Sequence, residues 1–185
     1  MDCCNRRASC RSSCARTTCS NRFSNRRTCR STVEVDRPEP DLAALDATTV
    51  GEAARELAGD TDPVLHADFT LPSPLVSRSP EVARYAAGIL SPERPLGEAL
   101  ADLYRRIHAD FAYQHGATSV RTTLEDLLRL RRGVCQDFAH LAVGCLRWAG
   151  LPARYVSGYL ETQPPPGREK LQGADASHAW LAVLT

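Results

Sequence analysis

The first thirty residues are too poor in apolar side chains to form a hydrophobic core. They contain eight arginines and six cysteines, yet besides Met1 their one large apolar side chain is Phe23. A segment of this composition buries too little apolar surface to offset the entropy lost on ordering. We therefore predict that residues 1–30 are a Cys/Arg-rich tail, either disordered or not a genuine part of the protein. The fold has to come from residue 31 onward.

Charge divides the chain at the same place. The tail holds eight arginines against the single acid Asp2, which leaves 15 basic and 21 acidic residues for 31–185. An acidic body of this kind offers no surface for nucleic acid. A metal- or nucleic-acid-binding module would have to be the tail, although its cysteines form no C-x-x-C pair and no histidine lies among them.

Membrane and metal partners are not indicated for the rest of the chain. No apolar run approaches the roughly 18 residues that span a bilayer, and the N-terminus lacks the apolar region of a secretory signal. We therefore predict a cytoplasmic location without a membrane partner. No acid-rich loop of the EF-hand type is present, so calcium is not implied and no cofactor is predicted.

Residues 31–78 are predicted to form a short strand followed by an extended linker. The strand is STVEV, from Ser31, and seven prolines and glycines interrupt the chain between residues 38 and 74. A weak helix is expected at 43–57. From residue 79 onward helix signals replace these breakers, so we place the core domain at 79–185.

Three helices are predicted between residues 79 and 132. Ser79-Pro80-Glu81 is a helix start whose helix runs to about residue 90, and Thr122 to Glu125 fits a capping box for a helix that ends near 132. Between them a long helix is expected at 95–111. Helical spacing predicts that its buried face consists of Leu96, Leu100, Leu103, Tyr104, Ile107 and Phe111.

A further helix is predicted to begin near Cys135, directly after the chain break at Gly133. Its apolar positions recur at intervals of three and four to Leu146, and Gly150-Leu151-Pro152 is a stop signal. Residues 153–160 and 178–184 are rich in Tyr, Val, Trp and Leu and are predicted to be strands. Helices followed by a sheet indicate an α+β fold.

Cys135 and His178 are the candidate catalytic pair. A helix N-terminus favours a thiolate, and an imidazolium would favour it further if the strand that begins at His178 packs beside the helix. The competing interpretation is a small buried thiol and an unrelated strand histidine. Spacing alone does not decide between the two.

The local sequences resemble the transglutaminase-like family of papain-type thiol enzymes. The resemblance is carried by GVCQDFAH from Gly133, GLPARYVSGY from Gly150 and SHAW from Ser177, and it extends upstream through FAY from Phe111. It implies a papain-like core in which helices pack on an antiparallel sheet. Covering roughly 150 residues in the expected order, it favours the catalytic interpretation of Cys135 over the structural one.

The resemblance implies a mechanism and site residues. Cys135 would attack the carboxamide of a protein or peptide and form a thioester, while His178 moves the proton and an amine or water accepts the acyl group. The Cys135 N–H, with Gln136 as a candidate second donor, would stabilise the oxyanion. Trp180 would either line the acyl site or simply pack in the sheet.

The third catalytic residue of the family is not found in the chain. The family places an aspartate about 15 residues after the histidine, whereas the sequence given stops at Thr185, so we expect a C-terminally truncated core with impaired activity. Asp175 is a weak substitute, because it precedes the strand in a Gly-Ala-Asp-Ala turn, where an Asx-type backbone contact explains it better. His140 is predicted to face away from Cys135, since five residues turn a helix by about 140°.

Besides a metal- or nucleic-acid-binding module in residues 1–30, which the sequence favours least, two functions remain for the rest of the chain. The first is a thiol acyltransferase or peptidase that acts through Cys135. The second is an inactive or fragmentary domain of the same fold that only binds.

Overall fold

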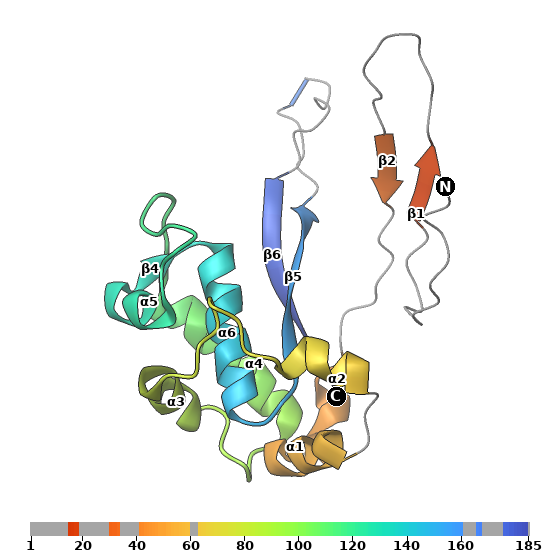
Figure 1. Ribbon diagram of the computed structural model, residues 1–185, viewed down its shortest axis with the longest axis vertical. Coiled ribbons are helices and arrows are strands. Elements are labelled where there is room, and N and C mark those ends of the chain that lie inside the picture. Colours follow the sequence, from red (N-terminus) through yellow and green to blue (C-terminus); the bar gives the residue numbers. More distant parts are fainter. Residues whose placement is uncertain are drawn as a thin grey trace. The chain divides into compact units, whose positions relative to one another are not determined.

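The computed structural model describes residues 15–18, 30–33, 41–59, 63–160, 166–167 and 176–184 (Figure 1). The chain divides into two compact units, Met1–Pro40 and Asp41–Thr185. In the first, β1 (Ala15–Thr18) pairs antiparallel with β2 (Arg30–Val33), which overlaps the strand predicted from Ser31. The sequence predicts disorder where β1 lies. The rest of residues 1–30 lies outside the described residues, so the nature of the tail stays a prediction.

Most of the predicted linker is helical and belongs to the core, which corrects its description as extended, whereas the helix expected at 43–57 is found there as two shorter helices. It contains the 3-10 helix η1 (Ala43–Ala47), α1 (Val50–Gly59) and α2 (Pro63–Thr70). The buried side chains of Val50 and Val76 belong to the same apolar cluster as those of the helices that follow. The domain boundary predicted at residue 78 is therefore not found within this unit.

A capping box, which the sequence prediction does not include, begins α1. The Thr49 N–H donates to the Glu52 carboxylate at 2.9 Å, and the Glu52 N–H donates to the Thr49 hydroxyl at 3.3 Å. Backbone bonds then tie this helix start to the loop before the long helix, with Gly51 N–H donating to the Pro92 carbonyl at 2.9 Å. The prolines and glycines of this segment predict an extended chain, but these contacts hold its residues at the start of a helix.

Helices α3 (Pro80–Ala87) and α5 (Leu124–Leu130) confirm their predicted start regions. The Ser79 hydroxyl accepts from the Val82 N–H at 3.2 Å. In α5 the cap is Thr123, which accepts from the Asp126 N–H at 3.2 Å, rather than the predicted Thr122. The Thr122 hydroxyl instead accepts from the Ser119 N–H in the preceding turn.

The long helix α4 (Leu96–Asp110) buries Leu96, Leu103 and Ile107, as the spacing predicts. Tyr104 is an exception, because 74% of its surface is exposed and its ring stacks on His108. It lies at the margin of the apolar face, where a tyrosine can keep its hydroxyl in water.

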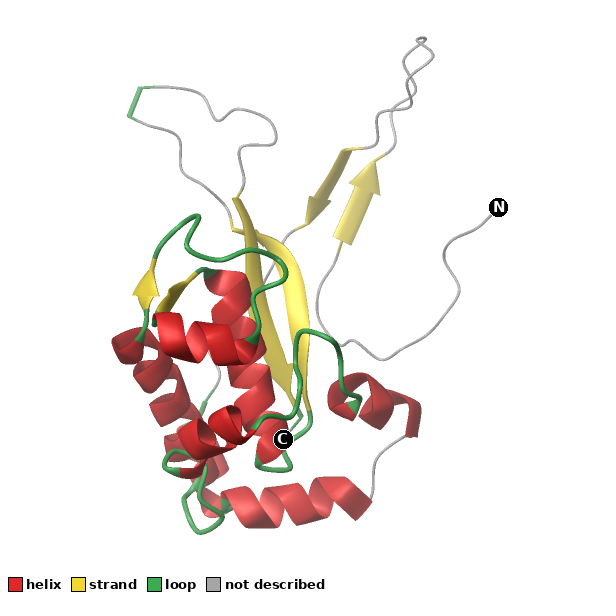
Figure 2. Cartoon of the chain, turned by 60° about the vertical axis from the view of Figure 1, so that its left-hand side comes forward, coloured by secondary structure: helices red, strands yellow, loops and turns green. Residues whose placement is uncertain are grey.

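Helix α6 (Cys135–Trp148) packs along a two-stranded antiparallel ribbon formed by β5 (Ala153–Leu160) and β6 (Ala176–Val183) (Figure 2). Ala153 and Ala179 are buried in this layer. Side chains alternate between the faces of a strand, so the odd-numbered residues of both strands face α6. The predicted helices and strands thus combine into an α+β fold.

A short parallel pair, which the sequence analysis did not predict, lies beside the start of α6. It joins β3 (Ala112–Tyr113) to β4 (Arg132–Gly133). Strands this short carry no periodicity, and their pairing depends on where α4 and α5 end.

In the described part of the chain no helix has the length and hydropathy to cross a membrane.

A substitution at Gly97 tests whether residues 41–59 pack against the core. A Cβ on Gly97 would lie 1.8 Å from the Leu42 carbonyl oxygen and 2.7 Å from Asp46 Oδ1. We expect Gly97→Ala to lower the free energy of unfolding by roughly 2 kcal/mol or more, since overpacking typically costs 1–3 kcal/mol. The measurement is denaturant unfolding followed by circular dichroism.

The matched control is Gly88→Ala, because a Cβ there meets nothing within 4 Å. We expect that variant to stay within about 0.5 kcal/mol of the parent chain. Equal stability of the two variants would show that η1 does not pack closely on α4.

Candidate active site

Cys135 is the first residue of α6 and is partly exposed. Val134 caps the helix, and its carbonyl accepts from the N–H groups of Asp137 and Phe138 at 3.0 and 3.2 Å. The first N–H groups of a helix have no partner within the helix and carry its positive dipole end. The thiol therefore lies where an anion is favoured, as the sequence predicts.

The buried carboxylate of Asp137 holds this helix start in place. Its Oδ2 accepts from the Val134 N–H at 2.8 Å and from the Thr118 hydroxyl at 2.6 Å. Gly133 packs against the same oxygen, and a Cβ there would approach it to 2.8 Å. The structure thus gives Asp137 a structural role at the cap of α6.

The β3–β4 pair brings Tyr113 to the thiol. Tyr113 lies opposite Gly133 in the parallel register, and the Gln114 N–H donates to the Gly133 carbonyl at 2.9 Å. The Tyr113 ring packs edge-on against Phe138 of α6, with centroids 6.2 Å apart. Burial raises the pKa of Tyr113, and the charge of Cys135 raises it further.

A second tyrosine, Tyr155 of the ribbon, is affected by the charge of Cys135. Tyr155 of β5 has its pKa raised by burial and then by the charge of Cys135, and its ring lies 4.8 Å from that of His140. Burial lowers the pKa of the half-buried His140, while the charge of Asp137 opposes that shift. β5 packs against α6 and brings Tyr155 to His140. The structure records no contact between His140 and Cys135, both of which it describes, so the predicted direction of His140 away from the thiol stays a prediction.

His178 and Trp180 lie on the other face of the ribbon. In the antiparallel register they are opposite Gly158 and Val156, whereas Tyr155 and the buried Ala179 belong to the face toward α6. No hydrogen bond joins Cys135 to His178, both of which the structure describes. The strand that carries His178 does pack beside α6, as predicted, but the alternation of side chains turns its ring away from that helix.

Trp180 covers a glycine on this outer face. A Cβ on Gly158 would lie 2.6 Å from the Trp180 ring, and the His178 ring meets the same indole edge-on at 5.2 Å. The arrangement explains why Gly158 has no side chain, and it supports the packing interpretation of Trp180. Its role in an acyl site stays a prediction.

Two other sequence candidates remain open. Gln136 follows Cys135 in the first turn of α6 and is partly buried, so its function as an oxyanion donor stays a prediction. Asp175 lies outside the described residues. Among the residues that are described, no three His, Cys, Asp or Glu side chains gather as metal ligands would.

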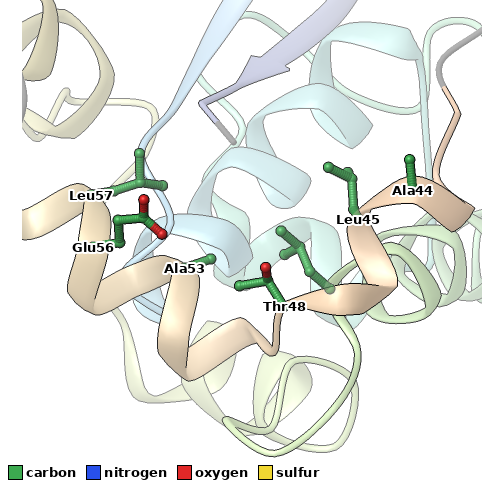
Figure 3. Close-up of a pocket in the computed structure, with 7 residues that line it drawn as sticks. Ala44, Leu45, Thr48, Ala53, Glu56 and Leu57 are labelled. Carbon is green, nitrogen blue, oxygen red and sulfur yellow. The ribbon is translucent and has the colours of Figure 1, made fainter.

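A hollow of about 210 Å³ lies elsewhere, between η1, α1 and α4 (Figure 3). It is smaller than most small-molecule sites, which occupy about 300–1,000 Å³. None of the sequence-predicted site residues lines it. The lining residues are Ala44, Leu45, Thr48, Ala53, Glu56, Leu57 and Leu96.

The role of Asp137 is tested by Asp137→Ala. The Val134 N–H and the Thr118 hydroxyl would both lose their acceptor, so we expect the free energy of unfolding to fall by roughly 2–4 kcal/mol. The control is Asp126→Ala, whose carboxylate is 41% exposed and pairs with Arg129 in solvent. A loss in Asp137→Ala no larger than in that control would contradict the assignment.

The two cysteines of the second unit are expected to differ in reactivity. Burial raises the pKa of Cys145 to about 12, so its reactive thiolate is absent up to at least pH 9. Cys135 is partly exposed at a helix N-terminus. We expect iodoacetamide to label Cys135 and spare Cys145 in the folded chain, with the label located by tandem mass spectrometry. Equal labelling below the unfolding transition would refute this.

Two mycobacterial proteins are similar to the chain in sequence. An uncharacterized protein of Mycobacterium tuberculosis is 46% identical over 158 residues, which cover 84% of this chain and 49% of that protein. An uncharacterized protein of Mycobacterium leprae is 34% identical over 161 residues, with 85% and 53% covered. The chain spans about half the length of the curated relatives it matches.

A solved structure and a family model carry more information. The crystal structure of a protein from Cytophaga hutchinsonii, described as a "Putative Cysteine Protease", aligns with a TM-score of 0.52 and 25% identity over 66% of this chain and 41% of that chain. The model of the transglutaminase-like superfamily matches residues 83–185, more than half of the sequence, including Cys135 and His178. The α+β arrangement is therefore the papain-like one that the sequence predicts, and the chain belongs to the transglutaminase-like superfamily.

Proposed function

We propose that the chain is a thiol enzyme that acts on a protein or peptide carboxamide through a Cys135 thioester. The observation that carries the proposal is the position of Cys135, partly exposed at the first residue of a 14-residue helix. A helix N-terminus stabilises a thiolate and supplies a backbone N–H for an oxyanion. Family membership supports the same chemistry.

In the first step the Cys135 sulfur attacks the carboxamide carbon. A carbon–sulfur bond forms, the carbon–nitrogen bond breaks, and the leaving nitrogen takes a proton and departs as ammonia or an amine. In the second step an amine or water attacks the thioester carbon, and the thiol is regenerated. The Cys135 N–H is the proposed oxyanion donor, with Gln136 as the candidate second donor.

The base in this proposal is His178, the histidine that the family resemblance indicates. In the observed register its ring lies on the ribbon face opposite α6. His140 lies on the Cys135 side, next to Tyr155. The test of the function therefore has to include both histidines.

The experiment measures ammonia release, incorporation of a fluorescent amine into casein, and casein hydrolysis by the full chain. We expect Cys135→Ala to abolish activity and Cys145→Ala, the matched control, to retain it. General base catalysis contributes about 10²–10⁴-fold, so His178→Ala should lose at least about a hundredfold and His140→Ala much less. The reverse order would move the base to His140.

The assay also separates the enzyme from a binding domain. Amine incorporation identifies a transferase, and casein cleavage identifies a peptidase. Absence of every turnover signal from a folded chain whose Cys135 still reacts with iodoacetamide would contradict the enzyme proposal. That outcome would favour a domain of this fold that only binds, for which the position of the His178 ring is the supporting observation.

A further inference from the structure

We propose that the ring contact between His140 and Tyr155 is a pH-sensitive contact between α6 and the β5–β6 ribbon, which weakens when the imidazole takes up a proton. The proposal concerns how firmly the ribbon packs on the helix that carries Cys135. It does not rest on the function proposed above, because opening of the ribbon can be measured without any substrate.

The contact joins the second turn of α6 to the first half of β5. Among the described residues, these two rings form the aromatic contact between α6 and the ribbon, with centroids 4.8 Å apart and planes at 31°. His140 is half-buried, and Tyr155 is 36% exposed. The next β5 side chains on the same face, Ser157 and Tyr159, are exposed. The contact therefore lies where β5 leaves the core.

The bonds that anchor the start of β5 do not change with pH in the range where a histidine titrates. Arg147 Nε donates to the Ala153 carbonyl at 2.8 Å, and the Leu184 N–H donates to the Pro152 carbonyl at 3.0 Å. An arginine stays protonated throughout this range. A weakening of β5 packing in mild acid therefore points to His140 rather than to these anchors.

Two neighbouring groups on α6 and β5 act on the His140 ring or face it. Burial lowers the pKa of His140, and the charge of Asp137, one turn earlier on α6, opposes this shift. The Asp137 carboxylate already accepts from the Val134 N–H and the Thr118 hydroxyl. Tyr155 stays neutral in acid, because burial and then the charge of Cys135 raise its pKa.

The other elements that pack on α6 bring no charge to this contact. On the ribbon, Arg154 and His178 belong to the outer face. On β4, the Arg132 side chain donates to the Leu130 carbonyl and to Gln114. Helices α3, α4 and α5 contribute apolar side chains to the cluster that contains α6, among them Val82, Leu103 and Leu124.

Mild acid therefore favours the open contact. A solvated imidazole has a pKa of about 6.5, and burial holds that of the packed His140 ring lower. Above pH 6.5 the ring is neutral in both states, so the contact has its full strength. As the pH falls below 6.5 the open state takes up the proton first, and the contact weakens until the packed ring also titrates.

A second histidine–tyrosine stack supplies the matched control. His108 stacks on Tyr104 with centroids 6.4 Å apart and planes at 29°, but both residues belong to α4 and both are exposed. This stack joins no two elements. Its protonation should therefore leave the ribbon unchanged.

The experiment measures hydrogen–deuterium exchange of the full chain by mass spectrometry from pH 8 to pH 5.5. Exchange rates are corrected for the intrinsic effect of pH, so that the protection of residues 153–160 reports how often β5 opens. The wild type is compared with His140→Phe, which keeps a ring but cannot be protonated, and with His108→Phe. Circular dichroism at pH 8 confirms that each variant is folded.

We expect protection of β5 in the wild type to fall several-fold between pH 8 and pH 5.5. The loss is at most about tenfold, because the open state gains a factor of ten per pH unit below the ordinary histidine pKa. His140→Phe should keep its protection across this range. His108→Phe should lose protection as the wild type does.

Three results would overturn the proposal: wild-type protection that does not depend on pH, a His140→Phe variant that keeps the wild-type dependence, or a His108→Phe variant that loses it. If His140→Phe fails to fold, NMR titration of the His140 ring replaces it. The wild-type midpoint should lie below 6.5 and move toward 6.5 in Tyr155→Leu, and equal midpoints would refute the contact. Acid opening of a chain without turnover would contradict the proposed function alone.

Discussion

The carboxylate of Asp137 is the contact on which the candidate site depends. A buried charge is tolerated only where donors surround it, and here one oxygen accepts from the Val134 N–H and the Thr118 hydroxyl. It joins the loop at residue 118 to the first turn of α6. Gly133 has no side chain because that oxygen occupies the space. The position of Cys135 follows from this single set of bonds.

A second group of contacts holds the ends of the neighbouring helices α4 and α5 together. Arg131 ends α5 in the left-handed conformation, with φ of 55°, and its guanidinium lies 5.1 Å from the centre of the Phe111 ring. The same guanidinium is 3.8 Å from the Asp110 carboxylate at the end of α4. Because α4 and α5 end side by side, β3 and β4 can pair directly after them. That pairing places Tyr113 beside the thiol.

The ribbon decides which side chains share the space around Cys135. The strand register decides which side chains lie on each face of the ribbon, because a shift of one residue would move every side chain of a strand to the opposite face. In the observed register Tyr155 faces α6 and meets His140, while His178 and Trp180 cover the outer face around Gly158. Burial raises the pKa of Tyr113 and of Tyr155, one from each strand pair, and the charge of Cys135 raises both further.

The sequence by itself determined the local elements: the starts of α3, α5 and α6, the extents of α4 and β5, and the thiol at a helix N-terminus. Caps, breakers and apolar periodicity involve residues within a few positions of one another, so they can be read from the chain. Only the tertiary structure decided the packing of the residue 41–59 segment, the β3–β4 pair and the face on which His178 lies. Each of these depends on contacts between residues far apart in sequence, and strand spacing alone does not reveal which face of the ribbon meets α6.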